Sequence, residues 1–181
     1  MPLTYDPDLH IILPEISRRA ILEHCNRALE AHQSGRTEEG KAFGLVCGTV
    51  SGQILTVADS FPLRQNVRSR SPYKEYMDRV MEEHAIASVT PLDLRGWVAD
   101  PAELFARIKE CRSKGRMLIG TYHMHKVGWK HDTLRDTPTT LDAVVARESG
   151  LLMFIISMVE PTRPVIRAFY EGIVDREIVI Q

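Results

Sequence analysis

The feature that most constrains the fold is a continuously apolar run at residues 151–158, with the sequence Leu-Leu-Met-Phe-Ile-Ile-Ser-Met. The run is too short to cross a bilayer, which takes roughly 20 apolar residues. Gly150 precedes it and Pro161 follows it closely, so its length is that of a strand and not of a helix. The sequence therefore predicts a sheet in which residues 151–158 form a central strand.

Shorter apolar runs predict the rest of this sheet. The dipeptide Ser51-Gly52 separates two of them and predicts a two-residue hairpin turn. The first run, at residues 10–13, is expected to form an edge strand. The expected strands lie at residues 10–13, 42–48, 53–58, 116–125, 151–158, 165–170 and 177–180.

Three helices are expected beside the sheet, at residues 15–32, 100–114 and 139–149. The second has the clearest start, because Asp100 can act as N-cap, Pro101 suits the first helical position, and Gly115 suits the end.

Residues 68–97 are less legible. They carry a local basic cluster and a helical pattern at residues 73–86. A solvated insertion is favoured here over a lid or a partner-docking segment.

Composition fits one domain over residues 1–181, with 44% hydrophobic and 26% charged residues. The net charge of −1 argues against nucleic acid or an anionic membrane as a partner. Cys25, Cys47 and Cys111 are odd in number and lie in apolar surroundings, so they are expected to be free thiols. With no secretory signal at the N-terminus, a cytoplasmic location is expected.

Two histidines, His123 and His125, end the apolar run at residues 116–125. Side chains alternate along a strand, so these two project to the same side. A carboxylate from the following loop would complete three protein ligands and leave one position open, as a catalytic zinc requires. Taken alone, a His-x-His pair is more often a strand end with two solvated histidines.

Further pieces of sequence occur in a definite order around this pair. They are the helix at 15–32, the glycine-bearing strand at 43–48, and segments 62–66, 100–104, 119–125, 138–142, 155–157 and 166–169. Together they cover most of the chain outside residues 68–97. In this order they resemble the JAMM (MPN-type) metalloprotease family in its compact bacterial form.

The resemblance implies an α/β (α+β) domain whose mixed, mostly antiparallel sheet is flanked by helices, layered as in cytidine deaminases. It implies a Zn²⁺ ion bound by His123, His125 and an aspartate, with a hydroxyl residue ahead of that aspartate supporting the oxyanion. The implied reaction is hydrolysis of a peptide or isopeptide bond. Its implied substrate is a protein or peptide, such as the C-terminus of a ubiquitin-like or sulfur-carrier protein.

Two aspartates compete for the third ligand position. The family spacing selects Thr133 and Asp136, whereas Thr139 and Asp142 come six residues later. The later pair is favoured because a proline precedes Thr139 and a helix is expected to begin there. On that choice the loop 126–137 carries an insertion, and its His131 is either solvated or a spare ligand.

The residue at the general-base position is the largest difference between this sequence and the family pattern. The position that holds the family's glutamate is Lys41, and Glu39 lies two residues earlier, about 6.6 Å along an extended chain. A base must come within about 3 Å of the water. Glu39, or Glu38, can therefore serve only if the chain bulges near Gly40, and otherwise both belong to a solvated acidic turn.

Two hypotheses follow. The favoured one is a zinc peptidase with Glu39 as base and Thr139 as the hydroxyl residue. The alternative is a binding module that keeps its metal ligands but has lost its base. The sequence fixes neither the substrate nor the oligomeric state, and a homodimer stays open.

Overall fold

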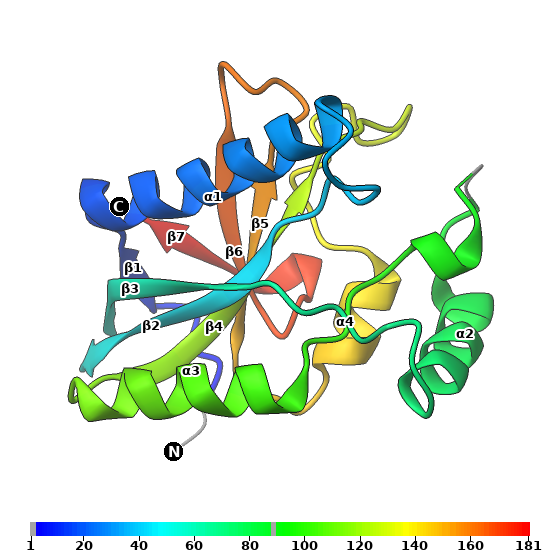
Figure 1. The fold of residues 1–181 in the computed structure, drawn as a ribbon. Helices are drawn as coiled ribbons and strands as arrows, with labels where there is room; N and C mark the ends of the chain where they lie inside the picture. Colours follow the sequence, from blue (N-terminus) through cyan, green and yellow to red (C-terminus); the bar gives the residue numbers. More distant parts are fainter. Residues whose placement is uncertain (1–2, 88–89) are drawn as a thin grey trace.

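The strands of this protein close into a barrel in the computed structural model, which describes residues 3–87 and 90–181 (Figure 1). Around the barrel the order is β1-β3-β2-β4-β5-β6-β7. In chain order the strands are β1 (His10–Ile12), β2 (Phe43–Ser51), β3 (Ile54–Leu63), β4 (Met117–His125), β5 (Leu152–Ser157), β6 (Val165–Tyr170) and β7 (Glu177–Ile180).

The predicted helix-flanked sheet of an MPN/JAMM-like domain, layered as in cytidine deaminases, is wrong. Such a sheet has two free edges, and residues 10–13 were expected to form one of them. Instead β1 pairs in parallel with β3 on one side and with β7 on the other, which joins the two ends of the sheet. β4 and β5 are also parallel, and the remaining neighbours are antiparallel. The expected two-residue hairpin is present, but its turn residues are Gly52 and Gln53, one position later than predicted, because Ser51 still pairs with Ile54; Gly52 has a φ of 59°.

Alternation along the strands divides the packing into two sides. Tyr122 and Met124 of β4 share the main hydrophobic cluster with Ile21 of α1. The other side of the neighbouring strands packs against α3, through residues such as Leu45, and against Ala146 of α4. Figure 1 shows α1 and α3 on opposite sides of the strands. The helices are α1 (Glu15–Gln33), α2 (Tyr73–His84), α3 (Pro101–Ser113) and α4 (Thr140–Ala146), with short 3-10 turns η1 (Leu92–Leu94) and η2 (Val174–Arg176).

The start of α3 is confirmed. One carboxylate oxygen of Asp100 accepts hydrogen bonds from the backbone N–H groups of Ala102 and Glu103, both at 3.0 Å. Gly115 follows the helix with a φ of 69°, a conformation that glycine adopts without strain.

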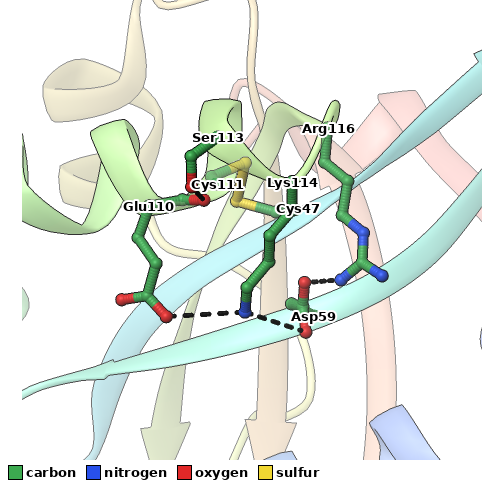
Figure 2. Close-up of a disulfide and its surroundings, with 7 residues drawn as sticks. All are labelled: Cys47, Asp59, Glu110, Cys111, Ser113, Lys114 and Arg116. Atoms are coloured by element: carbon green, nitrogen blue, oxygen red, sulfur yellow. Dashed lines mark hydrogen bonds and ion pairs between the residues drawn. A yellow bond between two sulfur atoms is a disulfide. The ribbon is translucent and has the colours of Figure 1, made fainter.

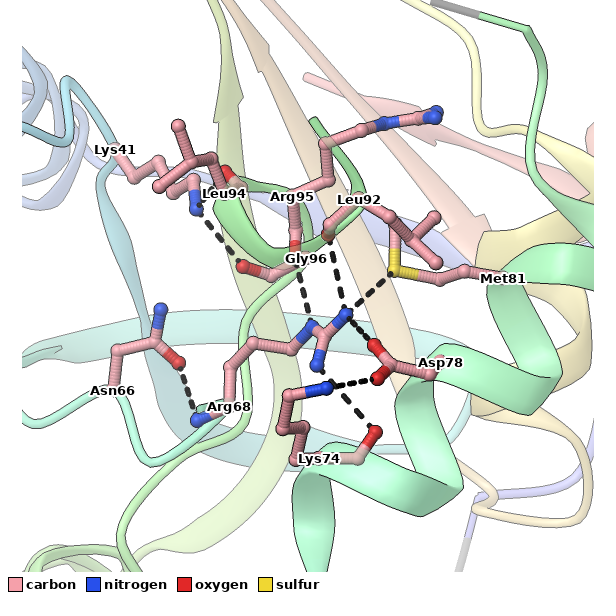
Figure 3. Close-up of polar contacts among 10 residues, drawn as sticks. All are labelled: Lys41, Asn66, Arg68, Lys74, Asp78, Met81, Leu92, Leu94, Arg95 and Gly96. Atoms are coloured by element: carbon pink, nitrogen blue, oxygen red, sulfur yellow. Dashed lines mark hydrogen bonds and ion pairs between the residues drawn. The ribbon is translucent and has the colours of Figure 1, made fainter. Parts of the chain in front are cut away.

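Most described residues of the segment expected to be a solvated insertion, 68–87 and 90–97, are exposed or partly exposed, but they pack around a buried arginine. The Arg68 side chain is 1% exposed, and Figure 3 shows its guanidinium between α2 and the η1 segment. It donates to an Asp78 carboxylate oxygen at 2.5 Å and to the backbone carbonyls of Arg95 at 2.9 Å and Leu92 at 3.2 Å. A charge buried this deeply is tolerated because its donors are matched by acceptors.

The expectation of three free thiols is also wrong. Cys47 of β2 and Cys111 of α3 form a disulfide (Figure 2). Cys25 is free and buried. The Cα atoms of the bridged pair are 6.2 Å apart, within the usual range. The two cysteines lie 64 residues apart in sequence, so only the packing of α3 on β2 reveals the pair. The thiols therefore give no support to a reducing compartment.

Candidate metal centre

Strand β4 positions the two histidines at its carboxyl end. His123 lies opposite Phe43 of β2 and Ile155 of β5, and His125 lies opposite Ser157. Both side chains alternate with the core residues of β4, so they project to the side of the sheet that faces α4. Their Nε2 atoms are 3.1 Å apart.

The N-terminus of α4 brings the carboxylate. Thr139 is the N-cap and Asp142 is the third helical residue of a reciprocal capping box. Oδ2 of Asp142 accepts hydrogen bonds from the Thr139 N–H at 2.7 Å and from its hydroxyl at 2.8 Å. Oδ1 is turned towards His123, with 3.6 Å between it and Nε2.

These three side chains form one cluster, which we call the triad. One donor atom from each of His123, His125 and Asp142 can be chosen so that all lie within 4.8 Å of one another. Asp136, the alternative third ligand, instead pairs with Arg167, with 3.1 Å between Oδ1 and Nη1. His131 lies outside the triad, with its ring 5.3 Å from that of Trp129.

The electrostatics of the triad favour a cation. Nδ1 of His125 donates to the backbone carbonyl of Arg135 at 2.7 Å, which leaves the lone pair on Nε2. Burial lowers the pKa of His125 to about 3, with a smaller contribution from His123, and burial also lowers the pKa of His123. Both rings are therefore neutral at pH 7, as metal ligands must be.

Zinc fits this donor set. Two imidazole nitrogens and one carboxylate oxygen are ligands that Zn²⁺ takes in catalytic sites, where a fourth position stays open. The two Nε2 atoms are 3.1 Å apart, a contact that either the ring proton of His123 or a cation can occupy, since Nδ1 of His123 has no partner among the described residues. Asp142 keeps Oδ1 free because the capping box engages Oδ2.

The proposed base lies outside the triad. The Glu39 carboxylate accepts from the Asn66 amide at 3.2 Å and pairs with the Lys41 amine at 3.4 Å. Nζ of Lys41 also donates to the carbonyls of Leu94 at 2.9 Å and Gly96 at 3.1 Å, and burial lowers its pKa (Figure 3). Lys41 thus ties the end of the 68–97 segment to β2, and Glu38 is exposed.

An aromatic stack lies beside the triad, and no pattern in the sequence indicated it. The Phe43 ring stacks on His123, with centroids 5.9 Å apart, and Trp97 stacks on the other side at 5.8 Å. Phe43 and Trp97 are 54 positions apart in the chain, and only the β2–β4 register places Phe43 opposite His123.

A cavity of about 400 Å³ lies at the N-terminus of α4, and its lining includes none of the three triad residues. Thr139 is part of its lining, and Gly172 lies so close to Asp142 that an added Cβ would sit 3.1 Å from the Asp142 backbone. The rest of the cavity is lined by a residue that follows α2, by the loop after β4, by α4 and by the η2 turn. These residues are Ile86, Trp129, His131, Asp132, Thr137, Pro138, Thr140, Ala143, Ile173 and Val174.

Comparisons with known proteins support the fold alone. No family model matches the chain, and no curated protein matches it. Among solved structures, 120 chains match. One is the solution structure of protein DSY2949 from Desulfitobacterium hafniense, a structural-genomics target, with a TM-score of 0.62 and 22% sequence identity. The match covers 94% of this chain and 91% of DSY2949. Among the helices described, none has the length and apolar character needed to cross a membrane.

Proposed function

We propose that this protein is a zinc-dependent hydrolase of peptide or isopeptide bonds with a JAMM-type ligand set, His123, His125 and Asp142. The observation that supports the proposal is the convergence of three possible metal-ligand atoms, one from each residue of the triad, at the end of β4. When bound, zinc supplies Lewis acidity, which polarises a carbonyl and acidifies water. The expected substrate is the exposed C-terminal tail of a protein, such as a ubiquitin-like or sulfur-carrier protein.

The chain's own residues divide the remaining work. The His125–Arg135 hydrogen bond fixes the imidazole tautomer, and the capping box fixes the Asp142 carboxylate. Phe43 and Trp97 shield His123 from water on one side. Glu39 is the carboxylate proposed to move the proton, with Lys41 and Asn66 orienting it.

A second function is favoured by one observation, the engagement of Glu39 by Lys41 outside the triad. With its carboxylate held there, the chain would bind a protein tail at the metal without cleaving it. This second candidate is a metal-bearing binding module.

Metal analysis and one substitution separate these functions. Protein purified without chelator should carry about one zinc per chain, and absence of metal would overturn both candidates. Cleavage of a ubiquitin C-terminal amide that carries a fluorogenic amine should occur with wild-type protein and not with Glu39→Gln, which should retain its zinc. Zinc binding without any cleavage by the wild type would favour the binding module. The matched control is Glu38→Gln, which should cleave as the wild type does.

A further inference from the structure

We infer that the Arg135 guanidinium forms a carboxylate-binding subsite beside the triad, so that the substrate presents a carboxylate close to the bond that is cleaved. The inference deepens the proposed function and rests on it for the identity of that bond. The binding of the carboxylate itself can be measured without any cleavage.

The Arg135 side chain is held in place but its donors are largely unused. Its Cζ lies 3.6 Å from the centroid of the Trp129 ring, so the planar cation stacks on the indole. Nη1 donates one long hydrogen bond, 3.4 Å, to the carbonyl of Val127. Nε is buried and, within the described ranges, has no partner. Buried donors of a guanidinium normally have acceptors, so these point to an absent ligand.

Two other buried or half-buried arginines of this protein form ion pairs with carboxylates. Arg68 binds Asp78, and Arg167 binds both Asp136 and Glu177. For Arg135, no carboxylate oxygen of the described chain lies within the 4.0 Å of an ion pair. A guanidinium offers a planar fork that matches a carboxylate with two hydrogen bonds.

Arg135 connects the triad to the cavity. Its backbone carbonyl accepts a hydrogen bond from His125 Nδ1, and its φ of 46° places it in the left-handed region, which is uncommon for a residue with a side chain. The indole beneath its guanidinium lines the cavity together with Thr139, whose hydroxyl is bonded to Asp142. A ligand in that cavity would therefore contact Trp129, on which the guanidinium stacks, and Thr139, which is bonded to Asp142.

The charges near the site favour an anion. A bound zinc ion and Arg135 supply three positive charges, and Asp142 and Asp132 supply two negative ones. Asp132 is already engaged, since its Oδ2 accepts from the Thr137 hydroxyl at 2.8 Å. The surplus is positive, so a carboxylate is attracted and a neutral amide is not.

The experiment uses the tryptophan as the reporter. The chain has two tryptophans, so Trp97→Phe in the full-length protein leaves Trp129 as the only tryptophan, which can be excited selectively over tyrosine, and keeps a ring on Phe43. Fluorescence titrations with N-benzoylglycine and with its amide should show about 10- to 100-fold tighter binding of the acid, the value of a hydrogen-bonded ion pair. Equal binding of acid and amide would overturn the inference.

Substitutions then identify the group that binds. Arg135→Gln should reduce the affinity for N-benzoylglycine to that for the amide, and Arg135→Lys should retain part of the preference. Arg163→Gln is the matched control, because Arg163 is 84% exposed and should bind as the parent does. An undiminished preference in Arg135→Gln with the parent zinc content would overturn the assignment.

Two further arms separate the possible outcomes. N-benzoyl-glutamic acid α-amide carries its carboxylate on a side chain, so comparison with N-benzoylglycine distinguishes an acidic side chain from a free C-terminus. Titration of the metal-free protein distinguishes the two proposals. A carboxylate preference without any zinc binding would support the subsite while the proposed function fails, and zinc binding without the preference would do the reverse.

Discussion

Two polar clusters of this protein, one around Arg68 and the other the triad, are satisfied to different degrees. In the cluster around Arg68, guanidinium donors meet a carboxylate and backbone carbonyls, and Lys74 pairs with the same carboxylate at 2.5 Å. In the triad, Nε2 of both histidines and Oδ1 of Asp142 converge, and the one proton that His123 can place on Nε2 leaves the other two atoms with unused lone pairs. A satisfied cluster stabilises a fold, whereas converging lone pairs indicate a site for something that the chain does not supply.

The largest expected effect tests the structural side of this comparison. Arg68→Met removes the cation and leaves the carbonyls of Leu92 and Arg95 without donors. Loss of one partner from a buried charged network costs about 3–5 kcal/mol, so urea unfolding should show that decrease. Zinc content should stay at the wild-type level. The exposed Arg70→Met serves as control and should change stability by no more than about 0.5 kcal/mol.

His24 of α1 contacts β4 on the side opposite the triad and belongs to neither cluster. It predicts a pH dependence of the stability of the fold. Burial, with smaller contributions from Arg27 and Arg64, lowers the pKa of His24 from 6.5 to about 4, and its Nδ1 lies 2.7 Å from the Tyr122 hydroxyl. In the unfolded chain His24 is protonated as the pH falls below about 6.5, whereas in the folded chain it is protonated only near pH 4. The stability contributed by neutral His24 is therefore present above pH 6.5 and is lost as the pH falls towards 4.

The expected loss is on the order of 3 kcal/mol over that range. Thermal or urea unfolding between pH 7 and pH 4 measures it. His24→Gln keeps a hydrogen-bonding group near Tyr122 and cannot titrate, so its stability should fall less on acidification. Equal pH dependence in both proteins would show that other groups dominate.

The effect of zinc on stability tests whether the triad is a metal site. A ligand that binds only the folded chain stabilises it by about 2.7 kcal/mol at 100 times its Kd. Zinc should raise the unfolding midpoint accordingly, and a chelator should reverse the rise. Asp142→Asn keeps an oxygen for the capping box and removes the charge, so it should keep the metal-free stability and lose most of the zinc-induced gain. The same gain in the variant would rule out Asp142 as ligand.

Sequence reasoning found the local features of this site and missed those that arise from closure of the chain. Helix starts, the hairpin and the direction of His123 and His125 follow from neighbouring residues, and the preference for Asp142 followed from a helix start at Thr139. Barrel closure through β1, the Cys47–Cys111 bridge and the buried Arg68 depend on contacts between residues distant in sequence. Periodicity carries no information about such pairs, and a charged residue in a polar segment gives no sign that it is buried.

The smallest effect bears on Thr139, which was predicted to act as a catalytic hydroxyl. Its hydroxyl donates to Asp142 Oδ2 and accepts from the Asp142 N–H at 3.3 Å, so it is engaged as a helix cap. Loss of such a cap costs about 1 kcal/mol, and Thr139→Ala should lower the free energy of unfolding by that amount. Thr139→Ser retains the hydroxyl and should restore it. If the hydroxyl also supports the reaction, Thr139→Ala will reduce kcat by more than the loss of bound zinc explains. If the hydroxyl is only a helix cap, the substitution will change stability and zinc binding through Asp142 alone. Measuring zinc content, unfolding and kcat on the same three proteins separates the two roles, because only the catalytic role lowers kcat at full zinc occupancy.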